Sequence, residues 1–322
     1  MKTMETRDKL YISIWEEDRK ACDIPLSHIS DGIKETPLRE VDELFGAADV
    51  LSIRNAGRHR RILLALSAAG TLLTLFFLLY DEAEAHGLIL ACGAMLVCLF
   101  CIRRFADRMD CHRKYVEYRV LAECLRCQFF LFFAGLGTRV TDILPWTIRQ
   151  DVPWIRDVLS ALPEAGSTEK HSILDCWIRD QKAYHASALK KAEVKDRRDR
   201  RISTVVLVLT VIVYCAALIY ELAVYRHAAG TGNADMIRAA LKIVLGTMSA
   251  ATLFTGNYYG KMSVSSAVDD HRRMIALYEE AEKEIVENGE SRELQLMLAG
   301  EFLSENSTWY AYQSRNKPDI IV

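Results

Sequence analysis

The sequence predicts an all-α membrane protein with four transmembrane helices in two hairpins and a cytoplasmic helical bundle formed by long extensions of the spans. Four stretches are long, apolar and nearly free of charge, whereas the segments around them are densely charged. Apolar residues within the charged segments recur at spacings of three and four, the period of an α-helix. The formal net charge of -2 gives no basic excess that would indicate nucleic acid as a partner.

The first predicted hairpin has its spans at residues 62–80 and 87–102. The first stretch contains no charged residue, and at about 1.5 Å per residue it approaches the roughly 30 Å thickness of the hydrocarbon layer. An acidic break at residues 81–84 ends it. The second stretch is slightly shorter, and it crosses the membrane if His86 and Arg103 lie at the two interfaces.

The second predicted hairpin has its spans at residues 203–220 and 241–259. Many residues of the third span are β-branched. They do not argue against a helix here, because in lipid a helix is the structure that pairs every backbone polar group within one segment. We expect the fourth span to face the bundle interior or water more than lipid, because it carries polar and small residues. These candidates for a pore lining or for close packing are Lys242, Gly246, Ser249, Thr252, Thr255, Gly256 and Asn257.

The positions of lysine and arginine predict a multi-pass protein of the inner (cell) membrane with both termini in the cytoplasm. Basic residues precede the first span and follow the second, whereas the short loop between these spans has none. A basic run at residues 190–201 precedes the third span, and the loop after that span has only Arg226 and Arg238. The basic run has two interpretations, contact with anionic lipid head groups or binding of an anionic signal.

Three segments follow from the positions of the spans. They are an N-terminal cytoplasmic segment at residues 1–40, the first hairpin with its cytoplasmic helices at residues 41–202, and the second hairpin with the C-terminal helices at residues 203–322. Each hairpin is preceded by a basic helix and followed by a cytoplasmic helix. This shared layout leaves open whether the halves are a true duplication or are alike by chance.

The segment between the second and third spans is predicted to be helical. Apolar residues at positions 116–132 have helical spacing. The apolar run at residues 128–134 is too short to cross a membrane, so it is either a buried helix or an interfacial foot. Residues 146–156 and 177–184 predict two short helices with a loop at residues 163–167 between them.

The chain has no catalytic signature, and we predict no catalytic, cofactor-binding or metal-binding residue. Cys124 and Cys127 form a CxxC pair on a predicted helix, without a second pair or a histidine at zinc spacing. Helix packing is therefore favoured over a redox or metal role. Histidines at positions 112, 171, 185 and 271 are spread over predicted surface helices, and none belongs to an HExxH motif.

Short motifs stand at residues 43–51, 118–130, 177–184 and 298–310. Together they resemble the SLATT family, the SMODS- and SLOG-associated two-transmembrane effectors, over residues 40–316. The residues that carry this resemblance are Tyr118, Arg119, Ala122, Glu123, Arg126, Gln128, Trp177, Gln181, Tyr184, Glu305 and Trp309. Arg119, Glu123 and Arg126 also share one helical face, which favours ion pairs within the helix or between subunits.

The resemblance implies a membrane effector of a bacterial conflict or antiphage system, which forms a pore or disrupts the bilayer when a sensor detects infection or a nucleotide signal. Some relatives carry a SLOG-type nucleotide-binding domain ahead of the membrane part. This chain departs from them, because about 40 residues cannot form a doubly wound domain and no glycine-rich phosphate loop is present. The expected sensor is a separate SLOG or nucleotide-signalling polypeptide.

Three functions remain open at this point. The first is a non-enzymatic effector that opens or disrupts the membrane; it requires a homo-oligomer, because four helices leave little room for a channel. The second is a non-conducting membrane anchor or scaffold for a SLOG or nucleotidyltransferase partner, with the fourth span as a central packing helix. The third is a small channel or transporter, which is less favoured because no span has a charged residue at its middle.

Overall fold

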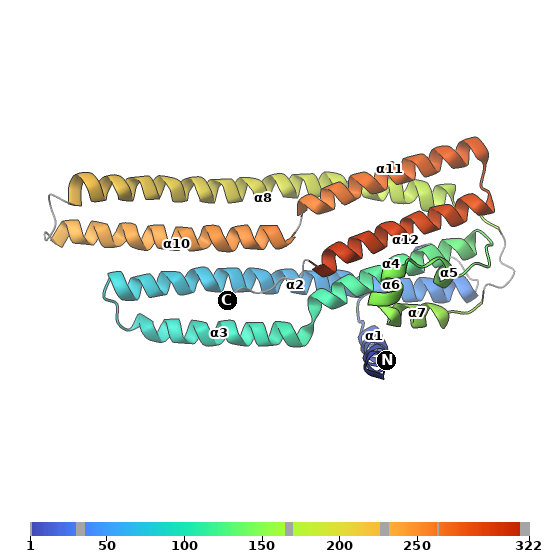
Figure 1. The fold of residues 1–322 in the computed structure, drawn as a ribbon, viewed down its shortest axis with the longest axis horizontal. Helices are drawn as coiled ribbons and strands as arrows, with labels where there is room; N and C mark the ends of the chain where they lie inside the picture. Colours follow the sequence, from blue (N-terminus) through green and yellow to red (C-terminus); the bar gives the residue numbers. More distant parts are fainter. Residues whose placement is uncertain (1, 30–35, 165–169, 226–231, 263, 316–322) are drawn as a thin grey trace. The chain divides into compact units, whose positions relative to one another are not determined.

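The structure is a computed structural model that describes residues 2–29, 36–164, 170–225, 232–262 and 264–315, and its regular structure there is entirely helical (Figure 1). Four helical stretches among these residues are long and apolar enough to cross a membrane, which confirms the predicted fold class. The helices are α1 (Lys2–Lys20), α2 (Thr36–Glu82), α3 (Leu88–Met109), α4 (Cys111–Phe133), α5 (Val140–Ile143), α6 (Trp146–Asp151), α7 (Pro153–Ser160), the π-helix η1 (Leu174–Arg179), α8 (Asp180–Ile219), the π-helix η2 (Tyr220–Tyr225), α10 (Gly232–Met262), α11 (Val264–Asn288) and α12 (Arg292–Arg315).

Contacts divide the chain into two compact units, which are described separately. Unit 1 comprises residues 1–58, 111–188 and 270–322, and unit 2 comprises residues 59–110 and 189–269. The units differ from the segments drawn along the chain, because α2 and α8 each belong to unit 1 at one end and to unit 2 at the other. Unit 2 holds the apolar stretches, and unit 1 holds the large buried core.

Helix α8 corrects one prediction. Residues 177–184 do not form a separate short helix, because the helix that begins at Asp180 continues to Ile219 and includes the third span. Neither glycine nor proline interrupts these residues, and their lysine, arginine, alanine and glutamate residues favour helix. The single short helix predicted at residues 146–156 is also wrong, because residues 146–160 form two short helices and Pro153 starts the second, α7. The predicted loop at residues 163–167 lies outside the described residues from position 165 onward, as does Arg226.

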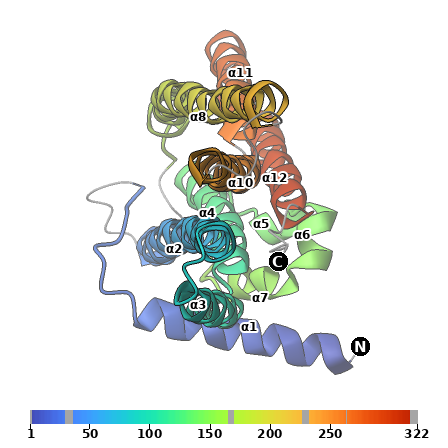
Figure 2. The same ribbon diagram turned by 90° about the vertical axis from the view of Figure 1, so that its left-hand side faces the viewer.

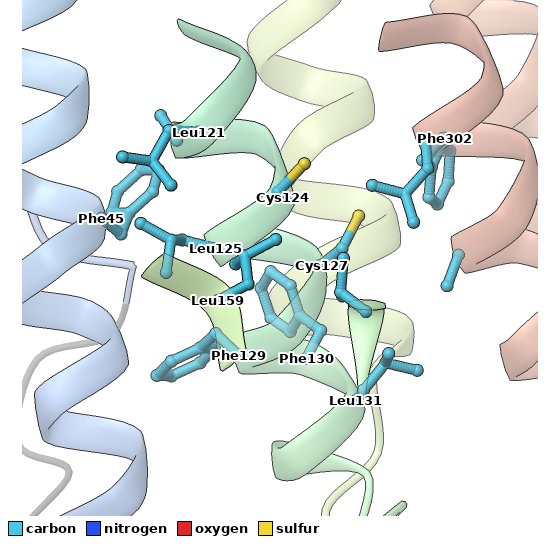
Figure 3. Close-up of a cluster of buried hydrophobic side chains, with 14 of the residues drawn as sticks. Phe45, Leu121, Cys124, Leu125, Cys127, Phe129, Phe130, Leu131, Leu159 and Phe302 are labelled. Atoms are coloured by element: carbon cyan, nitrogen blue, oxygen red, sulfur yellow. The ribbon is translucent and has the colours of Figure 1, made fainter. Parts of the chain in front are cut away.

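The core of unit 1 is built around α4. The apolar run at residues 128–134 belongs to a buried helix as far as Phe133, which is the first of the two alternatives. Phe129 and Phe130 are almost fully buried (Figure 3), as is Phe132. The ring of Trp177 stacks on Phe130 with a centroid distance of 4.7 Å, and it also contacts Phe302 at 5.0 Å. Trp177 therefore joins η1, α4 and α12 in one aromatic cluster.

Removal of the Trp177 ring should destabilise unit 1. Trp177→Ala is expected to lower the free energy of unfolding by about 3 to 5 kcal/mol, because it leaves a cavity between three helices. Trp146→Ala is the matched control, because Trp146 is 70% exposed and its loss should change stability by no more than about 0.5 kcal/mol. Urea unfolding of the purified chain in detergent micelles measures both values, and equal effects would contradict this description of the core.

Candidate functional site

A network of charged side chains lies on the face of α4 predicted to form ion pairs. Arg126 Nη1 lies 2.7 Å from Glu123 Oε2, and Arg119 Nη2 pairs with the other oxygen of the same carboxylate. Arg119 Nη1 also donates to Asp49 Oδ1 of α2 at 3.0 Å. Asp49 in turn accepts a hydrogen bond from Ser27 Oγ at 3.0 Å. The ion pairs within α4 are thus extended to a second helix, which spacing along one helix could not predict.

Burial and neighbouring charges have opposing effects on the pKa values of Glu123 and Arg119 in this network. Burial by itself raises the pKa of Glu123, but the guanidinium groups of Arg119 and Arg126 outweigh it and hold this pKa below its usual range. Burial likewise lowers the pKa of Arg119, and the carboxylates of Glu123 and Asp49 outweigh it and raise the pKa. Glu123 and Arg119 are therefore ionised at neutral pH, and the loss of one partner would leave a partly buried charge uncompensated.

Two histidines meet beside this network. Nδ1 of His185 in α8 lies 3.0 Å from Nδ1 of His271 in α11, so one ring donates to the other. His185 is only 9% exposed, and its ring also packs against Tyr278. The expectation of histidines spread over surface helices was therefore wrong for His185, because tertiary packing of α8 against α11 buries it. Among the described residues, no group of three or more metal-ligating side chains is present.

Both histidines favour the neutral form. Burial and then the neighbouring His271 lower the pKa of His185 to about 4, against the opposing effect of Glu123. Burial and the charge of Arg119 lower the pKa of His271. The pair is therefore uncharged at neutral pH, and its hydrogen bond links α8 to α11 within unit 1.

The other residues of the SLATT resemblance divide between the core and the surface of unit 1. Gln128 is buried, accepts a hydrogen bond from the Val140 N–H at 2.8 Å and donates to the Thr138 carbonyl at 3.3 Å. Glu305 pairs with Arg273 at 3.3 Å. Of the remaining residues, Tyr118, Ala122 and Trp177 are buried, Gln181 and Trp309 are half-buried, and Tyr184 is exposed. Most of these positions therefore have a structural task in unit 1.

The CxxC pair belongs to the packed core, as the favoured interpretation of the sequence predicts. Cys124 is fully buried and Cys127 is 4% exposed, both among apolar side chains (Figure 3). Burial raises the pKa of both thiols above the ordinary value. Neither sulfur is therefore a reactive thiolate at neutral pH.

Helix α10, the fourth span, lies between α2 and α8 in unit 2 (Figures 1 and 2). Its contacts with α2 run antiparallel along both helices. Lys242 Nζ donates to Glu82 Oε1 at 2.8 Å, and near the opposite end Arg60 Nε donates to the Tyr258 hydroxyl at 3.2 Å. Thr252 faces α8, where its hydroxyl lies 2.9 Å from the Thr210 hydroxyl. The fourth span thus contacts two neighbouring helices.

The polar and small residues of the fourth span divide into two groups. Lys242 and Thr252 have partners within unit 2, and a Cβ at Gly246 would lie 2.5 Å from Leu78 Cδ1. Gly256 and Asn257 are exposed, and a Cβ at Gly256 would meet nothing within 4 Å. Ser249 and Thr255 are half-buried. The two residues of the second group that are exposed within one chain, Gly256 and Asn257, therefore lie at one end of α10.

Comparison of the chain with models of protein families, with curated proteins and with solved structures found no match.

Sequence reasoning missed the partners that come from other helices. Asp49, His271 and Asp18 are examples; Asp18 Oδ2 of α1 accepts hydrogen bonds from Tyr118 and Lys114, both at 2.6 Å. One available signal is a charged residue on the apolar side of an amphipathic helix, and Asp49 has that position between Ala48 and Leu51. No such signal pairs His185 with His271.

Acidification should destabilise unit 1 through the histidine pair. In the unfolded chain both rings titrate near pH 6.5, so between about pH 6.5 and 4 the unfolded chain binds more protons than the folded chain. The contribution of His185 is fully present above pH 6.5 and is lost as the pH falls toward 4, by about 3 kcal/mol. Urea unfolding at pH 7.5 and 4.5 measures it. His185→Gln/His271→Gln should lose less stability over this interval, and an equal loss in both proteins would contradict the assignment.

Gly70 of α2 allows close approach of the fourth span. A Cβ at this position would overlap the ring of Phe254, so Gly70→Ala is expected to destabilise unit 2 by about 1 to 3 kcal/mol. Gly256→Ala is the control, because it makes the same change in helix propensity without a clash. Thermal unfolding in detergent compares the variants, and equal midpoints would show that α2 and α10 do not pack at Gly70.

Proposed function

We propose that this protein is a non-enzymatic membrane effector that forms homo-oligomers in the inner membrane and opens or disrupts it on a cytoplasmic signal. The observation that supports this proposal is that the apolar side chains of the four spans are largely exposed within one chain. The most apolar windows of these helices are 17%, 6%, 0% and 0% buried within one chain. Lipid or other copies of the chain must cover such surfaces, so assembly through the spans has ample apolar area available.

The exposed end of the fourth span supports the proposed conducting path. Gly256 and Asn257 are exposed among the residues that the structure describes, and Ser249 and Thr255 are only partly covered. Small and polar residues of this kind suit close helix approach between copies or a partly hydrated path. Thr252, in contrast, is engaged with Thr210 inside one chain.

The trigger is proposed to act on unit 1. The resemblance to the SLATT family favours a separate SLOG or nucleotide-signalling sensor as the partner, with both termini of this chain in the cytoplasm. Because α2 and α8 extend from unit 1 into spans, movement of unit 1 could be transmitted along continuous helices. A sensor must bind two conformations of unit 1 with different affinity to drive the change.

A non-conducting scaffold is the second candidate. The observation that favours it is the packing of the fourth span, because Lys242, Gly246 and Thr252 all contact neighbouring helices within one chain. In this case the spans are an anchor, and unit 1 recruits the partner.

Membrane potential separates the two candidates. Expression in a bacterial host, with and without neighbouring genes or phage challenge, should depolarise the membrane before lysis, as followed with a voltage-sensitive dye. Gly256→Leu should abolish depolarisation by filling the surface between copies, whereas Gly93→Leu, at another open position in a span, should leave it unchanged. Membrane fractionation checks insertion of both variants. An intact potential under every trigger would favour the scaffold.

A further inference from the structure

A cluster of charged and phenolic side chains lies in unit 2, where three long helices reach the ends of their spans. It combines Arg60 of α2, Lys195 and Asp199 of α8, and Tyr258 and Tyr259 of α10. Arg60 Nε donates to the Tyr258 hydroxyl at 3.2 Å, and the two tyrosine rings are 5.2 Å apart. Asp199 is 6% exposed and lies close enough to Arg60 and Tyr259 to interact with both electrostatically.

Positive charge is in excess in this cluster. Arg198 Nε lies 3.5 Å from Asp199 Oδ1, so Arg60, Lys195 and Arg198 share a single carboxylate. Lys195 has no ion-pair partner in the part of the chain that the structure describes. Burial lowers its pKa, and the positive charges of Arg60 and Arg198 lower it further, against the opposing effect of Asp199. An anion bound here would relieve this repulsion.

Two other arginines of the basic run on α8 do not share this feature. Arg200 Nε lies 2.8 Å from Asp196, and Arg197 lies 3.7 Å from Glu193, so each has a carboxylate of its own within α8. Both are exposed, as is Lys191. Lys195 differs from these exposed residues because it is half-buried and lies near two other positive charges, Arg60 and Arg198.

The position of the cluster along the helices matches the head-group layer. Arg60 precedes the first span by two residues, Asp199 precedes the third by four, and Tyr258 and Tyr259 end the fourth. At about 1.5 Å per residue these positions lie within roughly 6 Å of the hydrocarbon edge, which is the depth of the interfacial region. Lys195 precedes the third span by eight residues, or about 12 Å, so its long side chain must extend toward the membrane to reach the same layer. Tyrosine is typical of this layer.

We propose that Arg60, Lys195 and Arg198, with the tyrosine hydroxyl groups beside them, form a binding site for one phosphate group at the membrane surface. The guanidinium groups present paired N–H donors that match phosphate oxygens, and the Lys195 ammonium adds a point charge. The phosphate belongs either to the head group of an anionic phospholipid or to a soluble phosphate compound.

Binding of phosphatidylglycerol to the purified full chain tests this site. Native mass spectrometry of the protein from nanodiscs that contain phosphatidylcholine and phosphatidylglycerol measures the retained anionic lipid. We expect Lys195→Gln to weaken retention about fivefold, the effect of one cation near an anionic surface. Lys191→Gln removes the same charge from an exposed position on the same helix and should leave retention unchanged, and Lys195→Arg should preserve it.

Competition with inorganic phosphate and pyrophosphate distinguishes the two sources. Displacement of the lipid at millimolar concentration supports the site and assigns it to soluble phosphate compounds, whereas retention of the lipid assigns it to a head group. Equal losses of phosphatidylglycerol retention in Lys195→Gln and Lys191→Gln would overturn the proposal. Equal retention of phosphatidylglycerol and phosphatidylcholine by the unmodified protein, together with no binding of phosphate, would also overturn it. Circular dichroism checks that each variant is folded, and Arg198→Gln replaces Lys195→Gln if that variant does not fold.

Discussion

The backbone in lipid has no water to pair with, so every spanning residue must be hydrogen-bonded within its own helix. The rest of the architecture depends on this constraint. Helix α2 runs from Thr36 to Glu82 and α8 runs from Asp180 to Ile219, so each continues as a single helix from the charged part of the chain into a span. Within one chain, no connecting loop lies between the charged half of α2 or α8 and its apolar half.

Helix α4 has two kinds of surface in unit 1, one apolar and one charged. One face carries Phe129, Phe130 and Phe132 into the aromatic core, and another carries Arg119, Glu123 and Arg126 into an ion-pair network with Asp49. The network is only partly exposed, so its charges interact more strongly than surface pairs do. A partner that competes for one of these charges would therefore act on the packing of α4 as well as on its electrostatics.

Polar side chains in and near the spans of unit 2 form hydrogen bonds with neighbouring helices. The hydroxyls of Thr210 and Thr252 lie 2.9 Å apart, and each also lies within hydrogen-bond distance of a carbonyl one turn earlier in its own helix. Because each hydroxyl has one proton, one donates to the other, which donates to its own carbonyl, so both have partners without water. At the ends of the spans, polar side chains pair between helices, as Lys242 does with Glu82. The remaining exposed apolar surface is left for lipid or for other copies of the chain.

Hydropathy and charge along the chain determined the four spans, the helical class and the helical spacing of α4, because these depend on each residue and its near neighbours. The prediction failed where local pattern was weak: residues 177–184 continue into α8, and His185 is buried. Only the tertiary structure decided which helices meet, and hence the hydrogen bond between His185 and His271 and the proximity of Lys195 to Arg60. Such pairs join residues far apart in sequence, so their position depends on how helices pack rather than on spacing along one helix.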